Sequence, residues 1–181
     1  PGKCANWRKK RVLSFYPLIY PCLLLAEYYI KPEFWEKEAN VSSLIKKEYD
    51  IPANDFSRAG EASSNVRKLL TQLGVNPVII KRTSIAMYEA ELNVVIHGNG
   101  GKARVEIFED RIEIFVYDEG PGIEDIELAM KEGYSTAPDF IREMGFGAGM
   151  GLSNIKKNSD KFVIESEPGK GTRVYITIYL Y

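Results

Sequence analysis

Two segments in the middle of the chain space their apolar residues as helices do. In residues 55–73 these positions recur every three or four residues, at Phe56, Ala59, Ala62, Val66, Leu69, Leu70 and Leu73. Residues 77–97 repeat the pattern at Val78, Ile85, Met87, Leu92, Val95 and Ile96. We expect two long helices, with most of the second set of residues in the core. Asp55 and Gly74 would cap the first helix, with Pro77 and Gly98 at the ends of the second.

Four later segments alternate apolar and polar residues, as strands do. Residues 103–110 and 111–120 are predicted to form one antiparallel hairpin, and residues 161–167 and 172–180 another. Short helices are expected over 124–132, 138–144 and 150–159. This order predicts an α+β fold, a two-layer α/β sandwich with helices packed on one face of a mixed, mainly antiparallel sheet.

The first part of the chain has a different pattern, so we divide the sequence into an N-terminal extension (1–50) and a domain (51–181). A basic cluster at 8–11 precedes an apolar run at 12–26, as in a signal peptide or membrane anchor. The run is shorter than a bilayer span of about 20 residues, and two prolines interrupt it as a helix. Because the chain begins with Pro1, we expect non-native or functionally idle sequence here. A structural strand and membrane contact are the alternatives.

Residues 27–50 mix aromatic and charged residues and predict a short appended helix. Its apolar stripe would consist of Phe34, Trp35, Val41, Leu44 and Ile45. That stripe either packs against the domain or forms a surface for a partner or a second copy.

Composition narrows the function classes. The 181 residues are 45% hydrophobic and 27% charged, as expected of a globular protein with a core. A net charge of −1 gives no electrostatic reason to expect nucleic acid as a partner. Both cysteines, Cys4 and Cys22, lie in the extension, so the domain has neither a disulfide framework nor a cysteine zinc site. This suits a cytoplasmic protein.

Three polar residues on the second helix are the first candidates for chemistry. Glu89, Asn93 and His97 are four residues apart and therefore share one helical face. Their neighbours are apolar, and a buried polar group without a partner costs about 1–3 kcal/mol. A nucleotide with Mg²⁺ would supply partners, because the Asn93 amide oxygen suits a hard cation and Glu89 can polarise a hydroxyl or water near a γ-phosphate. The spacing alone leaves an exposed polar stripe equally open.

Asp118 ends the second predicted strand and precedes glycines at 120 and 122. Its carboxylate can accept a hydrogen bond from the edge of a base, and the glycines let the backbone approach a ligand closely. A simple strand-to-turn Asp-Gly pair is the alternative interpretation.

Glycines occupy every second position from 145 to 151 and lead into an apolar helix. Such a run lets successive backbone N–H groups turn toward a phosphate at a helix entrance. It does not match the phosphate loop that ends in Gly-Lys-Ser/Thr, and no strand precedes it as in a dinucleotide fingerprint. The polar stretch 124–144 would cover the ligand as a lid. A flexible surface linker is the alternative, although the helix starting at 150–152 argues against it.

These stretches, in this order, resemble the GHKL class of ATPases, which have the Bergerat ATP-binding fold. YEAELNVVIH resembles the asparagine box of that class, DEGPG the first glycine box, and GFGAGMGL the second. GKGT at 169–172 resembles the closing motif, whose threonine helps to hold the adenine. The resemblance covers roughly residues 50–181.

The resemblance implies ATP and Mg²⁺ as cofactors and gives the residues roles. Asn93 would hold Mg²⁺, Glu89 would be the catalytic base, Asp118 would bind the adenine amino group, and Thr172 would support that contact. Arg142 in the lid is a candidate γ-phosphate contact. The remaining residues expected at the cofactor are His97, Gly120, Gly122, Ile123, Gly145, Gly147, Gly149, Met150, Gly151 and Leu152.

Within the class, the chain most resembles bacterial anti-sigma-type serine/threonine switch kinases. The unit is small, Glu89 precedes Asn93 by four, and DEGPGIEDIELAMKEGYST resembles their lid opening. His97, the single histidine, lies in the asparagine box and is therefore not expected to be a phosphoacceptor. The resemblance implies a cytoplasmic kinase that phosphorylates a STAS-domain antagonist, with a sigma factor or regulatory phosphatase as further partners and a homodimer as one assembly. Membrane contact is not expected. A non-catalytic ATP-binding anti-sigma module and a detached ATPase domain of a sensor histidine kinase are the alternatives.

Overall fold

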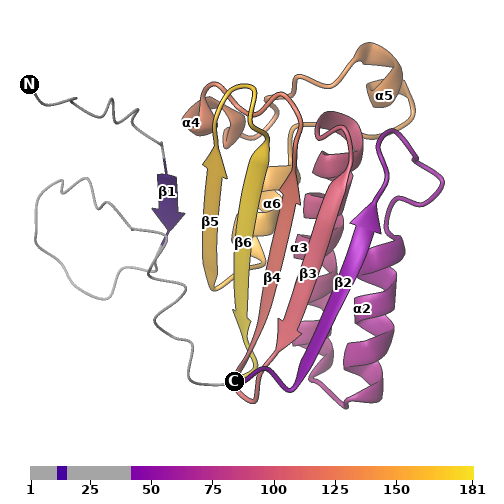
Figure 1. The fold of residues 1–181 in the computed structure, drawn as a ribbon, viewed down its shortest axis with the longest axis vertical. Helices are drawn as coiled ribbons and strands as arrows, with labels where there is room; N and C mark the ends of the chain where they lie inside the picture. Colours follow the sequence, from indigo (N-terminus) through magenta and orange to yellow (C-terminus); the bar gives the residue numbers. More distant parts are fainter. Residues whose placement is uncertain (1–11, 16–41) are drawn as a thin grey trace, which may run out of the picture.

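The computed structural model describes residues 12–15 and 42–181, which form one sheet with helices on one face (Figure 1). The strand order is β1-β5-β6-β4-β3-β2. All five strand pairings among the described residues are antiparallel, so no parallel pair makes this sheet mixed. The strands are β1 (Val12–Phe15), β2 (Ile45–Ile51), β3 (Gly101–Ile107), β4 (Arg111–Asp118), β5 (Lys161–Ser166) and β6 (Thr172–Tyr179). The expected two-layer α+β fold is confirmed.

Of the helices that the structure describes, three lie on one face of the sheet and two short ones lie at one end of it (Figure 1). The packed helices are α2 (Glu61–Gln72), α3 (Pro77–His97) and α6 (Gly151–Lys157). The segment between β4 and α6 contains α4 (Ile126–Ala129) and α5 (Asp139–Glu143), near the end of β4 and the start of β6 (Figure 1). None of the helices that the structure describes is long and apolar enough to cross a membrane.

The core lies between the sheet and α3. Alternation in β4 directs Ile112, Ile114 and Val116 to the helical face, where each is at most 2% exposed. Across from them, α3 contributes the small Ala86 beside the larger Met87, both fully buried. Small side chains let the helix approach the sheet closely, which fixes the height of its polar face above the strands.

Helix α3 has the predicted bounds, whereas α2 starts later than expected. Asn76 caps α3 by accepting a hydrogen bond from the backbone N–H of Val78 at 2.9 Å. Val78 itself is 64% exposed and does not belong to the predicted core, because it lies in the first turn of α3. Asp55 does not cap α2: its carboxylate accepts hydrogen bonds from Ser57, and the helix begins at Glu61 after Gly60.

The cap of α2 comes from the neighbouring helix. Gly60 has no side chain to offer, and Glu91 of α3 accepts hydrogen bonds from the backbone N–H groups of Ala62 and Ser63, both at 3.1 Å. Glu91 is only 3% exposed. It therefore serves as a buried N-terminal cap that ties α2 to α3, and the sequence pattern of α3 did not identify it.

The prediction of an appended helix over residues 27–50 is wrong at its C-terminal end, because Ile45–Ile51 form strand β2. This strand pairs with β3 along its whole length, from Ile45 opposite Ile107 to Ile51 opposite Gly101. The pairing satisfies the backbone groups of β3 that a helix could not reach. The sheet thus begins before residue 51. The rest of the predicted helix, including Phe34, Trp35 and Val41, lies outside the described residues. Within residues 1–26, the structure shows the alternative strand, β1, next to β5.

Candidate functional site

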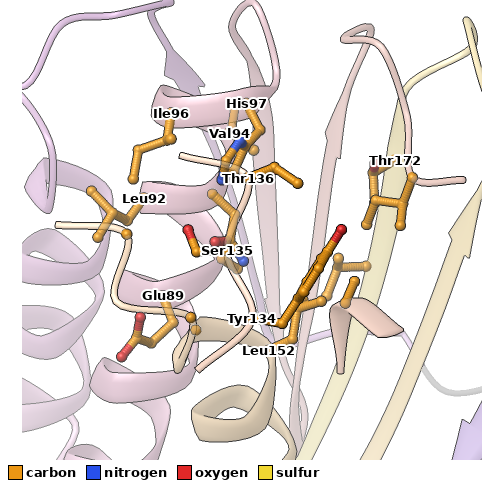
Figure 2. A pocket seen from close by; sticks show the side chains of 18 of the residues that line it. Glu89, Leu92, Val94, Ile96, His97, Tyr134, Ser135, Thr136, Leu152 and Thr172 are labelled. Carbon is orange, nitrogen blue, oxygen red and sulfur yellow. The ribbon is translucent and has the colours of Figure 1, made fainter. Parts of the chain in front are cut away.

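A cavity of about 640 Å³ opens where α3, the end of β4, the start of β6 and the segment 121–152 meet. Figure 2 shows side chains from these elements around it. The predicted residues that line the cavity are Glu89, Asn93, His97, Asp118, Gly122, Ile123, Gly145, Gly147, Gly149, Met150, Gly151, Leu152 and Thr172. Stretches far apart in the sequence therefore share one site.

The polar face of α3 forms one wall. Glu89, Asn93 and His97 are half-buried and line the cavity, so they do not form an exposed surface stripe. The Asn93 side chain makes no hydrogen bond within the described part of the chain, and a Cβ added at Gly151 would lie 3.0 Å from its Oδ1. The missing side chain at 151 thus leaves an opening beside a free amide oxygen.

The opening beside Asn93 suits a Mg²⁺ ion that takes few ligands from the protein and the others from phosphate and water. Among the described residues, no group of three or more histidine, cysteine, aspartate or glutamate side chains is placed to hold a metal alone. Mg²⁺ usually binds through one or two protein ligands and completes its shell with phosphate oxygens and water. The Asn93 amide oxygen is a suitable hard ligand for that arrangement.

Asp118 forms the opposite end of the site, where β4 meets β6. Its Oδ1 accepts a hydrogen bond from the backbone N–H of Gly120 at 2.8 Å. Burial raises the pKa of Asp118 above its ordinary value, and backbone hydrogen bonds from Gly120 and Thr172 oppose that rise. The fold around it is tight: a Cβ added at Gly98 would lie 2.7 Å from the Cβ of Asp118, and one at Gly171 would overlap its carbonyl oxygen.

Gly120 does not line the cavity, although it was expected at the cofactor. A Cβ added there would lie 2.6 Å from the carbonyl oxygen of His97 and 2.9 Å from Oδ1 of Asp118. The absence of a side chain at Gly120 therefore lets residues 118–120 pass close to the end of α3, where the N–H of Gly120 can bond the Asp118 carboxylate.

Ser166 of β5, which the sequence did not single out, holds Thr172 and Ile123 in place. Its hydroxyl donates to the carbonyl oxygen of Gly171 at 2.9 Å and accepts from the backbone N–H of Ile123 at 2.8 Å. The Oγ1 of Thr172 lies 3.0 Å from the same hydroxyl oxygen. Because the single proton of Ser166 goes to Gly171, Thr172 donates to Ser166 and keeps its own oxygen as an acceptor toward the cavity.

The glycine loop and the segment before it close the third side. Gly145, Gly147 and Gly149 all have positive φ, between 69° and 89°, a backbone region that other residues rarely adopt. Phe146 stacks on Phe56 with ring centroids 5.7 Å apart, which anchors the loop to the chain before α2. These contacts fix the path of the loop beside α3.

Residues 134–136, which the sequence placed in the lid without naming them individually, also line the cavity. In Figure 2 the Tyr134 ring lies between Leu152 and Thr172. The backbone N–H of Gly133 donates to Gly149 at 2.9 Å, which ties this part of the lid to the glycine loop.

Arg142 is not brought to the cavity. It pairs with Asp139 one turn earlier in α5, at 3.0 Å, and its side chain is 52% exposed. A short exposed helix carries both residues, so the local ion pair forms outside the site.

The His97 imidazole is expected to be neutral at neutral pH. Burial lowers the pKa of His97 below its ordinary value of 6.5. The folded state therefore binds the proton less readily than the unfolded state, and the free energy of unfolding should fall as the pH drops below about 6.5. Because His97 is the single histidine, one NMR titration measures its pKa directly. A midpoint at or above 6.5 would contradict this prediction. A His97→Gln variant, which cannot titrate there, is the control for the stability measurement.

The amide of Asn93, the carboxylate of Glu89, the glycine loop and the half-buried Asp118 surround one cavity, an arrangement that suits a nucleotide. Comparison with known proteins agrees: the family model described as histidine kinase-, DNA gyrase B-, and HSP90-like ATPase matches residues 80–181. The match covers more than half of the chain, which therefore belongs to this family of ATPases. ATP is accordingly the nucleotide that suits the cavity.

Individual relatives indicate which members of this family the chain is similar to. The chain is 32% identical over 134 residues to the serine/threonine-protein kinase RsbT of Bacillus subtilis, covering 72% of this chain and 89% of that protein. It is 40% identical over 100 residues to the anti-sigma F factor of Clostridium acetobutylicum, covering 52% of this chain and 66% of that protein. A third relative, the anti-sigma F factor of Oceanobacillus iheyensis, is 34% identical over 130 residues, covering 67% of this chain and 81% of that protein.

Proposed function

We propose that the protein is an ATP-dependent serine/threonine protein kinase of a partner-switching system. It transfers the γ-phosphoryl group to a hydroxyl of a STAS-domain antagonist in the cytoplasm, and a sigma factor or regulatory phosphatase is a further partner. One observation carries the proposal: a carboxylate and a free amide oxygen on α3, from Glu89 and Asn93, both face the opening beside Gly151. The names of the relatives support the class of reaction.

Asp118 and Thr172 would bind the base. The Asp118 carboxylate accepts hydrogen bonds from the backbone N–H groups of Gly120 and Thr172, and its remaining lone pairs are available to the amino group of adenine. Thr172 offers an acceptor oxygen that Ser166 holds in place. The apolar residues that line the cavity, such as Ile123 and Leu152, would contact the faces of the ring.

The glycine loop would hold the phosphates through the backbone N–H groups of residues 147–150, since those of Gly145 and Phe146 already donate hydrogen bonds within the lid. Asn93 would hold Mg²⁺, which neutralises charge on the phosphate oxygens when bound. Glu89 would accept the proton of the attacking hydroxyl. With the donor in the loop and the base on α3, the acceptor hydroxyl must approach the γ-phosphate from the Glu89 side.

The test of this function is a transfer assay with labelled ATP, Mg²⁺ and the STAS-domain proteins encoded near its gene. We expect stable label on a serine or threonine of one of them. Acid-labile label would instead indicate histidine phosphorylation and overturn the proposal. Tight binding of a sigma subunit without any transfer would favour the non-catalytic anti-sigma module instead.

Asp118→Asn should weaken ATP binding by about 10- to 100-fold. The amide must direct its N–H₂ group at either the Gly120 N–H or the base, and a hydrogen bond to a charged group contributes about 1.5–3 kcal/mol. Calorimetric titration measures the loss. GTP, whose base carries an oxygen where adenine carries the amino group, should bind the wild type less well than ATP. An unchanged ATP affinity in the variant would show that Asp118 does not bind the base.

A further inference from the structure

A side chain that does not line the cavity donates a hydrogen bond to Glu89. The side-chain amide of Asn154 donates from Nδ2 to Oε1 of Glu89 at 2.7 Å. Asn154 lies on α6, directly after the glycine loop, and does not line the cavity. It reaches Glu89 across 65 residues of sequence and is therefore a contact that only the fold creates.

This hydrogen bond makes the two oxygens of Glu89 different. Oε1 is taken by the Asn154 amide, whereas Oε2 faces the opening beside Gly151. A Cβ added at Gly151 would lie 3.5 Å from Oε2 of Glu89 and 3.0 Å from Oδ1 of Asn93. One carboxylate oxygen and the amide oxygen of Asn93 thus point to the same place.

Asn154 is fixed to the end of the glycine loop. Its backbone N–H donates to the carbonyl oxygen of Met150 at 2.8 Å, and the hydroxyl of Ser153 donates to the same oxygen at 2.9 Å. One turn later, at the end of α6, the Asn158 side chain donates to the backbone oxygen of Asn154 at 2.8 Å, a bond that does not involve the side-chain amide that contacts Glu89. A movement of the loop that shifts the start of α6 would therefore shift the group that orients Glu89.

We propose that Asn154 is the positioning residue of the phosphotransfer reaction: it turns Oε2 of Glu89 toward the acceptor hydroxyl and couples this orientation to the glycine loop. The inference rests on the proposed kinase function. In the step concerned, the acceptor oxygen bonds to the γ-phosphorus while its proton passes to Oε2. The bond from the γ-phosphorus to the β,γ-bridging oxygen breaks, and ADP leaves with the electron pair. Glu89 is then in place only when the loop is in its nucleotide-binding arrangement.

A purely structural role for Asn154 would have a different signature. If the amide only held α6 against α3, its removal would lower stability and ATP affinity together. A positioning role lowers kcat and leaves the binding of ATP intact, because Asn154 does not reach the cavity. It also depends on Glu89 being able to accept a proton.

The experiment compares Asn154→Ala and Asn154→Asp with Asn158→Ala, a matched change one turn along the same helix. For Asn154→Ala we expect kcat to fall about 10- to 100-fold, as for a misplaced catalytic group, with the KM for ATP within about twofold. The isosteric Asn154→Asp, which places a second carboxylate against Glu89, should lose at least as much. Asn158→Ala should keep kcat within about twofold. Equal losses in kcat for Asn154→Ala and Asn158→Ala would overturn the proposal.

A second comparison separates the inference from the function on which it rests. In a Glu89→Gln background, Asn154→Ala should change kcat by less than about twofold, because there is no base left to orient. A loss as large as in the wild-type background would overturn the positioning role. If the wild type transfers no phosphate at all, the kinase function is wrong. The pairing is then decided by NMR: the Asn154 side-chain amide signals should shift on Glu89→Gln, and unchanged signals would refute it.

Discussion

Glu89→Gln is expected to lower kcat for phosphotransfer by about 10²- to 10⁴-fold, the range for loss of a general base. Glutamine has the shape of glutamate and still offers an oxygen to Asn154, whose amide donates to Oε1 of Glu89 at 2.7 Å. It cannot accept the proton of the attacking hydroxyl. The expected loss is therefore in the chemical step, and the affinity for ATP should stay within about twofold. Steady-state kinetics with the partner protein and calorimetric titration with ATP measure the two quantities separately.

Glu124 provides the matched control for this prediction. It also lines the cavity, but it is exposed to solvent and lies in the lid segment just before α4, not on α3. Glu124→Gln should leave kcat within about twofold. A Glu89→Gln enzyme within tenfold of the wild type would exclude Glu89 as the base. A large loss of ATP affinity would instead mean that Glu89 binds the nucleotide or its metal.

The parts of the site that the sequence revealed are those with a local signature. Glu89, Asn93 and His97 share a face because a helix repeats every 3.6 residues, so their meeting needs no tertiary information. The glycine run and the Asp-Glu-Gly-Pro-Gly stretch are likewise continuous in sequence. Their assembly around one cavity also requires the antiparallel pairing of β4 with β6, which joins the two predicted hairpins and which the alternating pattern did not predict.

The parts that the sequence did not reveal depend on contacts between distant elements. Asn154 and Ser166 are ordinary polar residues until the fold brings the first to Glu89 and the second to Ile123. Strand β2 was hidden for another reason. It is an edge strand whose middle residues, Lys46 to Glu48, are exposed and charged, so it lacks the alternation that identified the inner strands.

The second large effect concerns stability. Glu91→Ala should lower the free energy of unfolding by about 3 kcal/mol, because it leaves the backbone N–H groups of Ala62 and Ser63 without their acceptor, at roughly 1–3 kcal/mol each. For a domain of this size, the midpoint of thermal unfolding should fall on the order of 10 °C. Glu91→Gln, which keeps one acceptor oxygen, should lose less. Thermal or denaturant unfolding followed by circular dichroism measures both variants.

Glu61→Ala tests whether Glu91 stabilises the protein because it is a buried acceptor or only because it places negative charge near the start of α2. Glu61 lies in the first turn of the same helix, but its side chain is 52% exposed and pairs with Arg58 at the surface. Its removal should leave the unfolding midpoint nearly unchanged. Equal effects of Glu61→Ala and Glu91→Ala would contradict the cap. If Glu91→Ala does not fold, Glu91→Gln decides, because a midpoint equal to that of the wild type would show that the second acceptor oxygen is dispensable.

Substitutions of Glu89 and Glu91 should therefore have opposite effects on stability and turnover, although the two residues lie only two positions apart on one helix. A helix turns about 200° over two residues, so Glu89 faces the cavity while Glu91 faces α2. Glu89→Gln should retain stability and lose turnover. Glu91→Gln should lose stability and, well below its unfolding midpoint, retain ATP binding and turnover. If Glu91→Gln lost turnover while fully folded, the cap on α2 would also be required to hold α3 in its catalytic position.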